Sequence, residues 1–125
     1  MGARITGPDI VKLNQPLIIA QWMRDTLQTH GRCVLHTNPS HGLRVAVAAQ
    51  DAGIDLTGAT LRVGGEPLTP AKLTAIENSG LRVVCAYGMT ESATISMSCA
   101  YRTVSDDMHL FTDGYALITH PYLVE

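Results

Sequence analysis

Apolar positions repeat along this 125-residue chain with two spacings that alternate. Three segments have the spacing of amphipathic helices, and three short apolar runs have the character of buried strands. The helical segments are residues 14–31, 38–53 and 69–80, and the strand-like runs are residues 32–36, 59–65 and 81–86. Strands that alternate with helices of about 10–15 residues are typical of βαβ units. The pattern therefore predicts a three-layer α/β fold with a mainly parallel sheet and right-handed crossovers.

The helical segments are bounded by residues that start and stop helices. Asn14, Asn38 and Thr69 each stand before a helical segment, and a proline follows each of them in the first turn. Such side chains accept hydrogen bonds from the free backbone N–H groups of a helix start. Gly31 and Gly53 close the first two segments, since glycine readily adopts the left-handed conformation that ends a helix.

The pattern changes after Glu91, where helical spacing does not return. Residues 94–104, 108–113 and 115–125 have the composition of short strands joined by polar turns. We place a boundary near residue 98. Residues 1–98 are then a flavodoxin-like α/β subdomain, and residues 99–125 are a short β-rich C-terminal tail that begins a further subdomain. The chain stops within this pattern, which predicts a piece of a longer protein.

Composition and charge argue against several classes of function. Apolar residues make up 46% of the chain and charged residues 16%, as in ordinary globular domains. The net charge is −2 without a block of like charges, so no nucleic acid partner is expected. No stretch is long and apolar enough for a membrane span, and the first residues do not form a signal peptide. Three widely spaced cysteines favour a reducing, cytoplasmic location over a disulfide framework.

Three polar loops follow the predicted strands, namely TNPS at residues 37–40, GGEPLTP at 64–70 and YGMTES at 87–92. In doubly wound sheets, ligands bind outside the carboxyl ends of the strands, so we expect these loops to converge on one crevice. Gly64 and Gly65 have no Cβ and let the backbone approach a flat ligand closely. Tyr87 can offer a ring face on which a base stacks.

The third loop adds groups that suit a phosphate and a cation. Thr90 can donate a hydrogen bond to a phosphate oxygen, and Glu91 is the hard oxygen ligand that magnesium prefers. Together with Tyr87 and the glycines, these residues predict a nucleotide site. A Thr-Glu pair also caps helices, and that alternative stays open. The chain contains neither a Walker lysine nor a GxGxxG motif.

The two motifs together resemble those of a known superfamily. VGGEPLTP at residues 63–70, followed after one helix by VVCAYGMTES at 83–92, is similar to the adenylate-forming (AMP-binding) enzymes. The spelling is closest to phenylacetate- and acyl-coenzyme A ligases. The resemblance implies a fragment of the N-terminal domain of such a ligase. It also implies that Tyr87 covers one face of the adenine and that the other face is lined by Gly64, Gly65, Glu66 and Pro67.

The resemblance implies a reaction as well. Thr90 would contact the α-phosphate, and Glu91 would hold a magnesium ion, so these two residues carry the catalytic roles. Gly88 and Met89 would border the pocket of a small-molecule carboxylate. ATP and the carboxylate would give an acyl-adenylate, and coenzyme A would then take the acyl group. Oriented donors and the metal ion would stabilise the charge on the reacting phosphate.

Three parts of such a ligase have no counterpart in these residues. They are the triphosphate loop, the ribose-binding aspartate and the catalytic lysine of the C-terminal domain. FTDG at residues 111–114 comes too early in the chain to replace the aspartate motif. We therefore expect the rest of the parent chain to be a necessary partner and the isolated 125 residues to be inactive.

Histidines and cysteines supply weaker candidates. Some phenylacetate-type ligases carry a zinc site in the region of Cys99 and His109, and His120 could add a third ligand. A closed zinc site needs four ligands, so a buried cysteine and a surface histidine are the alternative. His36 and His41 flank the TNPS loop. We interpret them as a strand-end and a first-turn histidine, and lining of the acyl pocket is the alternative.

A different class of function competes with the ligase. A flavodoxin-like interaction or regulatory module would keep this fold without the chemistry. A response-regulator domain would need an acidic cluster after the first strand, and residues 32–38 (RCVLHTN) contain no acidic residue.

We expect the isolated chain to form no acyl-adenylate from ATP and any carboxylate, because the groups that bind the triphosphate and the ribose are missing. Carboxylate-dependent exchange of labelled pyrophosphate into ATP measures this directly. Exchange above background that disappears in Glu91→Ala would contradict the expectation.

Overall fold

The computed structural model describes residues 7–91, 93–98, 102–105 and 107–110. The helices are α1 (Pro16–His30), α2 (Pro39–Asp51) and α3 (Pro70–Glu77), and the strands are β1 (Cys33–Thr37), β2 (Ala59–Val63), β3 (Arg82–Met89), β4 (Ala93–Met97) and β5 (His109–Leu110). The predicted alternation of three helices with three strands is therefore confirmed. None of the described helices is long and apolar enough to cross a membrane.

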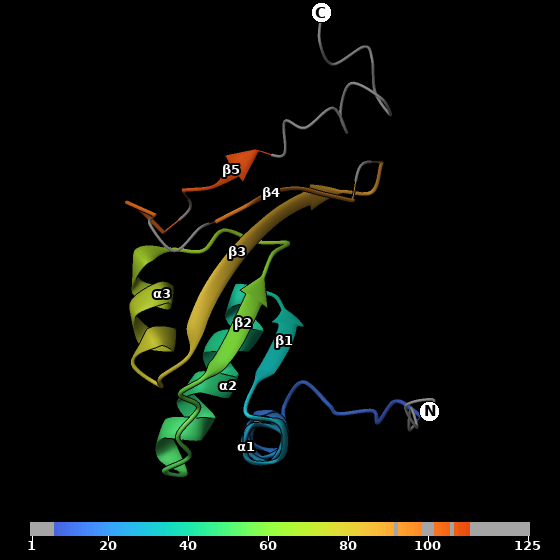
Figure 1. Cartoon of the computed structure of the whole chain (residues 1–125), viewed down its shortest axis with the longest axis vertical. Helices are drawn as coiled ribbons and strands as arrows, with labels where there is room; N and C mark the ends of the chain where they lie inside the picture. Colours follow the sequence, from blue (N-terminus) through green and yellow to red (C-terminus); the bar gives the residue numbers. More distant parts are fainter. Residues whose placement is uncertain (1–6, 92, 99–101, 106, 111–125) are drawn as a thin grey trace, which may run out of the picture.

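The strands form one sheet in the order β1-β2-β3-β4-β5 (Figure 1). β1 and β3 both pair with β2 in parallel, which confirms the predicted parallel sheet for these three strands. The β3–β4 and β4–β5 pairs are antiparallel. Only an antiparallel pair can follow the short link between Met89 and Ala93, because a parallel pair needs a long crossover. The sheet thus includes β5, which lies beyond the boundary predicted near residue 98, and that boundary stays a prediction.

Two of the predicted helix starts are confirmed in detail. Asn38 caps α2 by accepting a hydrogen bond from His41 N–H at 2.8 Å. Thr69 caps α3 by accepting one from Lys72 N–H at 3.3 Å. In both helices the proline occupies the first turn, where its missing N–H leaves no bond unmade.

The start of α1 differs from the prediction. Gln15 holds the cap position without a side-chain hydrogen bond, and the helix begins at Pro16. Gln15 N–H donates to the Lys12 carbonyl at 2.9 Å, so a backbone turn already precedes the helix. Asn14 lies within that turn, which is why its prediction as the cap is wrong. The predicted stop is confirmed, because Gly31 ends α1 in the left-handed conformation with φ 71°.

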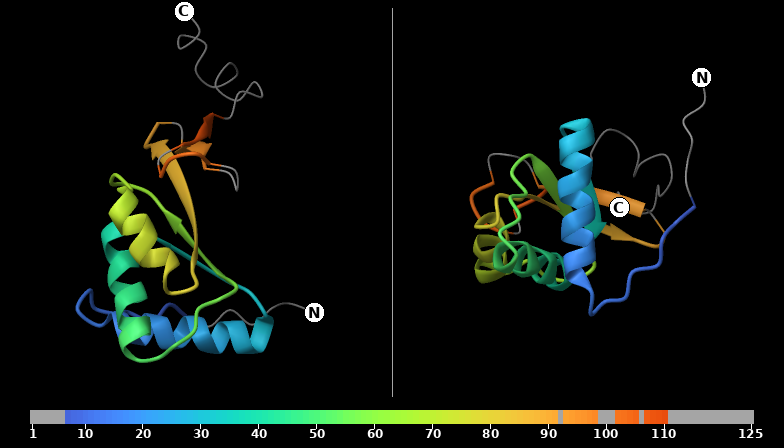
Figure 2. Two further views of the ribbon diagram at one scale, coloured as in Figure 1. Left: turned by 90° about the vertical axis from the view of Figure 1, so that its left-hand side faces the viewer. Right: turned by 90° about the horizontal axis from the view of Figure 1, so that it is seen from below.

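α2 and α3 cover one face of the sheet, and α1 lies across the end at which β1 begins (Figure 2). α2 contacts both α1 and α3, and all three helices pack on the strands. Leu61 and Val83 on this face are at most 1% exposed, and Gly42 of α2 lies so close to Leu61 that a Cβ would have no room. β1, β2 and β3 lie side by side in the order of the chain. Because the two crossovers have the same hand, α2 and α3 lie on the same side of the sheet.

The opposite face, which we call the open face, carries none of the described helices. Along each strand, the residues between the core residues face this side of the sheet. Val34 of β1 is one of them and is 63% exposed. Parallel sheets are normally covered on both faces. The described residues therefore form two layers, and the third layer of the predicted flavodoxin-like unit is not among them.

We expect Val83→Ala to lower the free energy of unfolding by about 2–3 kcal/mol, because it removes two buried methyl groups. Val34→Ala is the matched control, since it makes the same change in a strand of the same sheet but on the open face. It should cost less than about 1 kcal/mol. Urea unfolding of both variants measures the difference. Equal losses would show that the open face is covered in solution.

Candidate functional site

The loops after β1, β2 and β3 lie at the same edge of the sheet, as the parallel order requires (Figure 1). Two hollows open there, with volumes of ≈ 390 and ≈ 420 Å³. The smaller, which we call the open-face groove, has a lining that includes His36, Arg62, Gly64, Tyr87, Thr90 and Thr94. The larger, which we call the loop cavity, has a lining that includes Gly65, Glu66, Pro67, Leu68, Tyr87 and Met108.

Tyr87 is a wall that the two hollows share. It lies near the end of β3, where the register with β4 shifts between Tyr87 and Gly88. Its side chain is 50% exposed, so the ring is not part of the core. Gly65 also lines both hollows, and the loop of residues 65–67 lies on the same cavity as Tyr87. A flat ring held between the tyrosine and this loop would need such an arrangement.

Gly64 and Gly65 are required by the backbone itself. A Cβ on Gly64 would lie 2.7 Å from the Ala86 carbonyl oxygen of β3, which is too close for a side chain. Gly65 has φ +85°, a conformation that costs an L-residue roughly 1–2 kcal/mol. The two glycines therefore shape the turn after β2, in addition to leaving room for a ligand.

The YGMTES stretch forms the end of β3 and the turn toward β4. β3 ends at Met89 and β4 begins at Ala93, so Thr90 and Glu91 start no helix and the helix-cap alternative is wrong. Gly88 has no room for a Cβ, because the Ala93 carbonyl oxygen occupies that position. Thr90 and Glu91 are both exposed at the turn, and Thr90 lines the open-face groove together with Gly88 and Met89.

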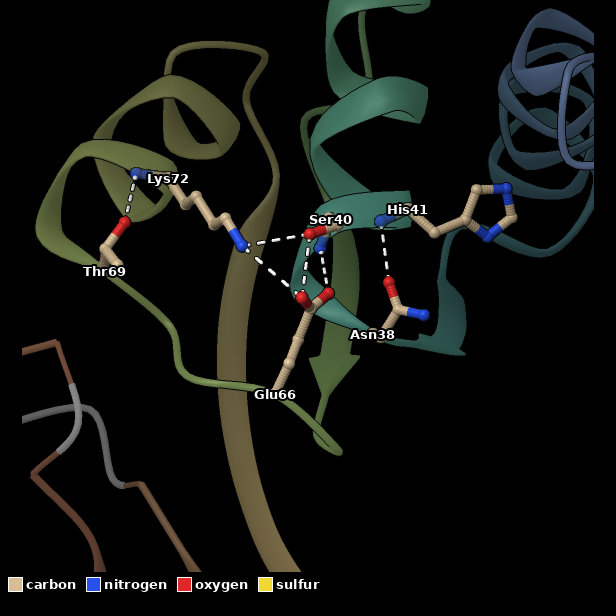
Figure 3. Close-up of polar contacts among 6 residues, drawn as sticks. All are labelled: Asn38, Ser40, His41, Glu66, Thr69 and Lys72. Carbon is tan, nitrogen blue, oxygen red and sulfur yellow. Dashed lines mark hydrogen bonds and ion pairs between the residues drawn. The ribbon is translucent and has the colours of Figure 1, made fainter.

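Glu66 joins the loop after β2 to two helices, as Figure 3 shows. Its Oε1 accepts a hydrogen bond from Ser40 N–H at 2.6 Å, and its Oε2 accepts one from Ser40 Oγ–H at 2.8 Å. Lys72 Nζ of α3 lies 3.5 Å from the same Oε2 and donates to Ser40 Oγ at 2.9 Å. Ser40 is in the first turn of α2, where backbone N–H groups lack helical partners and the helix dipole attracts an anion.

These contacts lower the pKa of the Glu66 carboxyl below its ordinary value of 4.5. The main cause is the hydrogen bond from Ser40 N–H to the charged form, followed by that from the Ser40 hydroxyl, with a smaller attraction from Lys72. The Glu66 side chain is 31% exposed, so water screens the Lys72 attraction. Glu66 therefore positions the loop after β2, because its carboxylate is already hydrogen-bonded to the first turn of α2.

Arg62 is a residue of the open-face groove that the sequence analysis missed. It lies directly opposite His36 across β1 and β2, so both side chains are on the open face. Arg62 Nη2 donates a hydrogen bond to Thr94 Oγ1 of β4 at 2.7 Å. Strand alternation could have identified it: Leu61 and Val63 are core residues, so an arginine between them must face the other side of the sheet.

The metal predictions are not settled by the described residues. Cys99 and His120 lie outside the described ranges, and His109 is opposite Met97 in the sheet. Within those ranges, no three His, Cys, Asp or Glu side chains are grouped as a metal site requires. Zinc at Cys99 and His109, and magnesium at Glu91, stay predictions.

No protein-family model matches the chain, and no curated protein matches it. The resemblance to adenylate-forming ligases therefore rests on the two motifs alone.

We expect Glu66→Gln to destabilise the fold at neutral pH, because the amide loses the charge-assisted contact with the start of α2. The folded carboxyl has the lower pKa, so its contribution is complete above the unfolded value and is lost as the pH falls through the folded value. The stabilities of the wild type and the variant should therefore converge in acid. Urea unfolding from neutral pH down to about pH 3 measures this.

Lys72→Met is a useful comparison for Glu66→Gln. It should cause a smaller loss, because the Lys72 attraction is the smaller cause of the lowered pKa. A stability gap between wild type and Glu66→Gln that is the same at every pH would show that the carboxylate charge does not contribute.

Proposed function

We propose that the loop cavity binds the adenine of ATP or AMP and that the chain is the ATP-binding core of an acid–thiol ligase. The observation that carries the proposal is that Tyr87 and the loop of residues 65–67 line the same cavity. A purine is flat, and a tyrosine ring opposite a glycine-containing backbone gives it two suitable walls. Leu68 and Met108 add apolar side chains to the lining, which suits a base better than a phosphate.

The phosphates would then extend toward the turn after β3. Thr90 and Glu91 are exposed there, so neither side chain belongs to the core. In this proposal Thr90 donates a hydrogen bond to the α-phosphate. Glu91 supplies a carboxylate oxygen to magnesium, which would neutralise phosphate charge when bound.

The carboxylate substrate would approach along Gly88 and Met89, which line the open-face groove beside Thr90. Its oxygen would attack the α-phosphorus and release pyrophosphate, and coenzyme A would take the acyl group in a second step. The remaining groups for the triphosphate and the ribose would come from the rest of a parent protein, which we place in the cytoplasm.

The open face of the sheet supports a second candidate, a flavodoxin-like interaction or regulatory module. Val34 is 63% exposed on that face, whereas the strands of parallel sheets are usually covered on both sides. A module of this kind would use the open face for docking and would have no use for the loop cavity. Nucleotide binding separates the two candidates.

We expect AMP to bind the chain weakly and Tyr87→Ala to weaken the binding about 5- to 150-fold, since stacking of a base on an aromatic ring contributes about 1–3 kcal/mol. The melting temperature should change little, because the Tyr87 side chain is half exposed. Trp22→Ala is the matched control, because Trp22 is 52% exposed and lies in α1, outside the lining of the cavity. An NMR titration with AMP measures both. Equal affinity of wild type and Tyr87→Ala would favour the module instead.

Glu91→Ala should leave AMP affinity unchanged and should weaken ATP only when magnesium is present, because the carboxylate acts through the metal ion. Parallel titrations with ATP, with and without magnesium, measure the effect. A loss of AMP affinity without magnesium would assign Glu91 a direct or structural role.

A further inference from the structure

The open-face groove holds polar groups that the proposed adenine site does not use. Arg62 and His36 are direct neighbours on β2 and β1 and both line the groove. Thr90 and Thr94 add hydroxyl groups, and these four side chains can all donate hydrogen bonds. Neither aspartate nor glutamate occurs among the described residues that line the groove. This composition suits an anion.

Arg62 has hydrogen-bond donors to spare. Its Nη2 donates to Thr94 Oγ1 at 2.7 Å, whereas its buried Nε has no acceptor among the described residues. Arg62 is also absent from the ion pairs of the described residues, which are Arg24–Asp25, Lys72–Glu66 and Arg102–Glu77. A partly buried guanidinium without an anion is unfavourable, because it loses water without gaining a counter-charge.

Arg102 is a useful comparison, because its guanidinium is engaged in contacts within the protein. It donates to the Val83 carbonyl oxygen at 2.6 Å and to Glu77 Oε1 at 2.6 Å. Its charge is therefore paired within the protein. Arg62 of β2 is also partly buried but is bonded only to a neutral hydroxyl among the described residues.

We propose that the open-face groove binds a carboxylate group of a small organic acid through Arg62 and His36. A volume of ≈ 390 Å³ falls within the range of about 300–1,000 Å³ for small-molecule sites. A guanidinium can form two parallel hydrogen bonds with one carboxylate. A nucleic acid would need more cations than the groove offers. The inference rests on the proposed function in one respect, namely that the acid would be a substrate of the ligase. A second carboxylate of that acid would then react near Thr90.

Benzoate and benzamide test the proposal, because they share a ring and differ in whether its substituent is a charged carboxylate or a neutral amide. The full chain should bind benzoate at least about tenfold more tightly, as expected for hydrogen bonds to a charged group. Arg62→Gln should abolish this preference. Arg82→Gln is the matched control. Arg82 of β3 is opposite Thr60, and Thr60 precedes Arg62 by two residues in β2. Arg82 lies outside the lining of the groove. NMR titrations give all the affinities.

The competing explanation is that Arg62 only ties β2 to β4 through Thr94. In that case wild type binds the two probes equally, or binds neither, and Arg62→Gln lowers only the stability. Either result would overturn the proposal. Arg62→Lys covers the case in which Arg62→Gln fails to fold. It keeps the charge but loses the planar pair of donors, so it should fold and show a reduced preference for benzoate.

AMP alone, as a third probe, distinguishes a substrate carboxylate from the nucleotide phosphate. If Arg62→Gln weakens AMP but leaves the benzoate preference intact, Arg62 holds the phosphate and the proposal is overturned. If Tyr87→Ala leaves AMP affinity unchanged while the benzoate preference persists, the nucleotide proposal fails and the anion site stands.

Discussion

The contact between the Glu66 carboxylate and the start of α2 holds the candidate site in place. The loop that carries Glu66 begins with two glycines, which give a chain more conformational freedom than any other residue. Two hydrogen bonds from Ser40 and the nearby Lys72 charge fasten this loop to α2 and α3. An anion at a helix start is favoured by both the free N–H groups and the helix dipole, so one carboxylate is enough to fix the loop to α2. A fixed loop is what makes Tyr87 one side of a defined cavity.

The long strand β3 supplies the other side of that cavity. Its first half pairs with β2 up to Cys85, and from Ala86 onward it pairs with β4 instead. The strand therefore continues past the end of the parallel sheet, and Tyr87 stands beyond the last residue of β2. The same change of partner brings Thr94 within reach of Arg62 across the open face. The two hollows thus follow from one feature, the extension of β3 into an antiparallel pair.

Local features of the fold could be predicted from sequence, and features set by distant residues could not. The caps at Asn38 and Thr69 were predictable because a side chain bonds to a backbone group three residues away. The start of α1 is a local exception, because the backbone turn between Lys12 and Gln15 replaces the cap predicted at Asn14. The sequence pattern predicted three layers, whereas the described residues form two. The pattern does not give the order of the strands in space, and that order decides on which face each helix packs. The Glu66–Ser40 bond joins residues 26 positions apart, and no spacing rule indicates it.

The position of Tyr87 between the hollows has a consequence for the proposed reaction. A base in the loop cavity and an acid in the open-face groove would contact the same residue from two sides, since Tyr87 lines both. Thr90 lines the groove just beyond Tyr87, where a phosphate attached to that base and a carboxylate of that acid would meet. Holding two reactants in this way converts their encounter into an effectively unimolecular step, which is a large part of what an enzyme can contribute. In this proposal the chain's own residues align the reactants, and the anion held by Arg62 sets which end of the acid faces the phosphate.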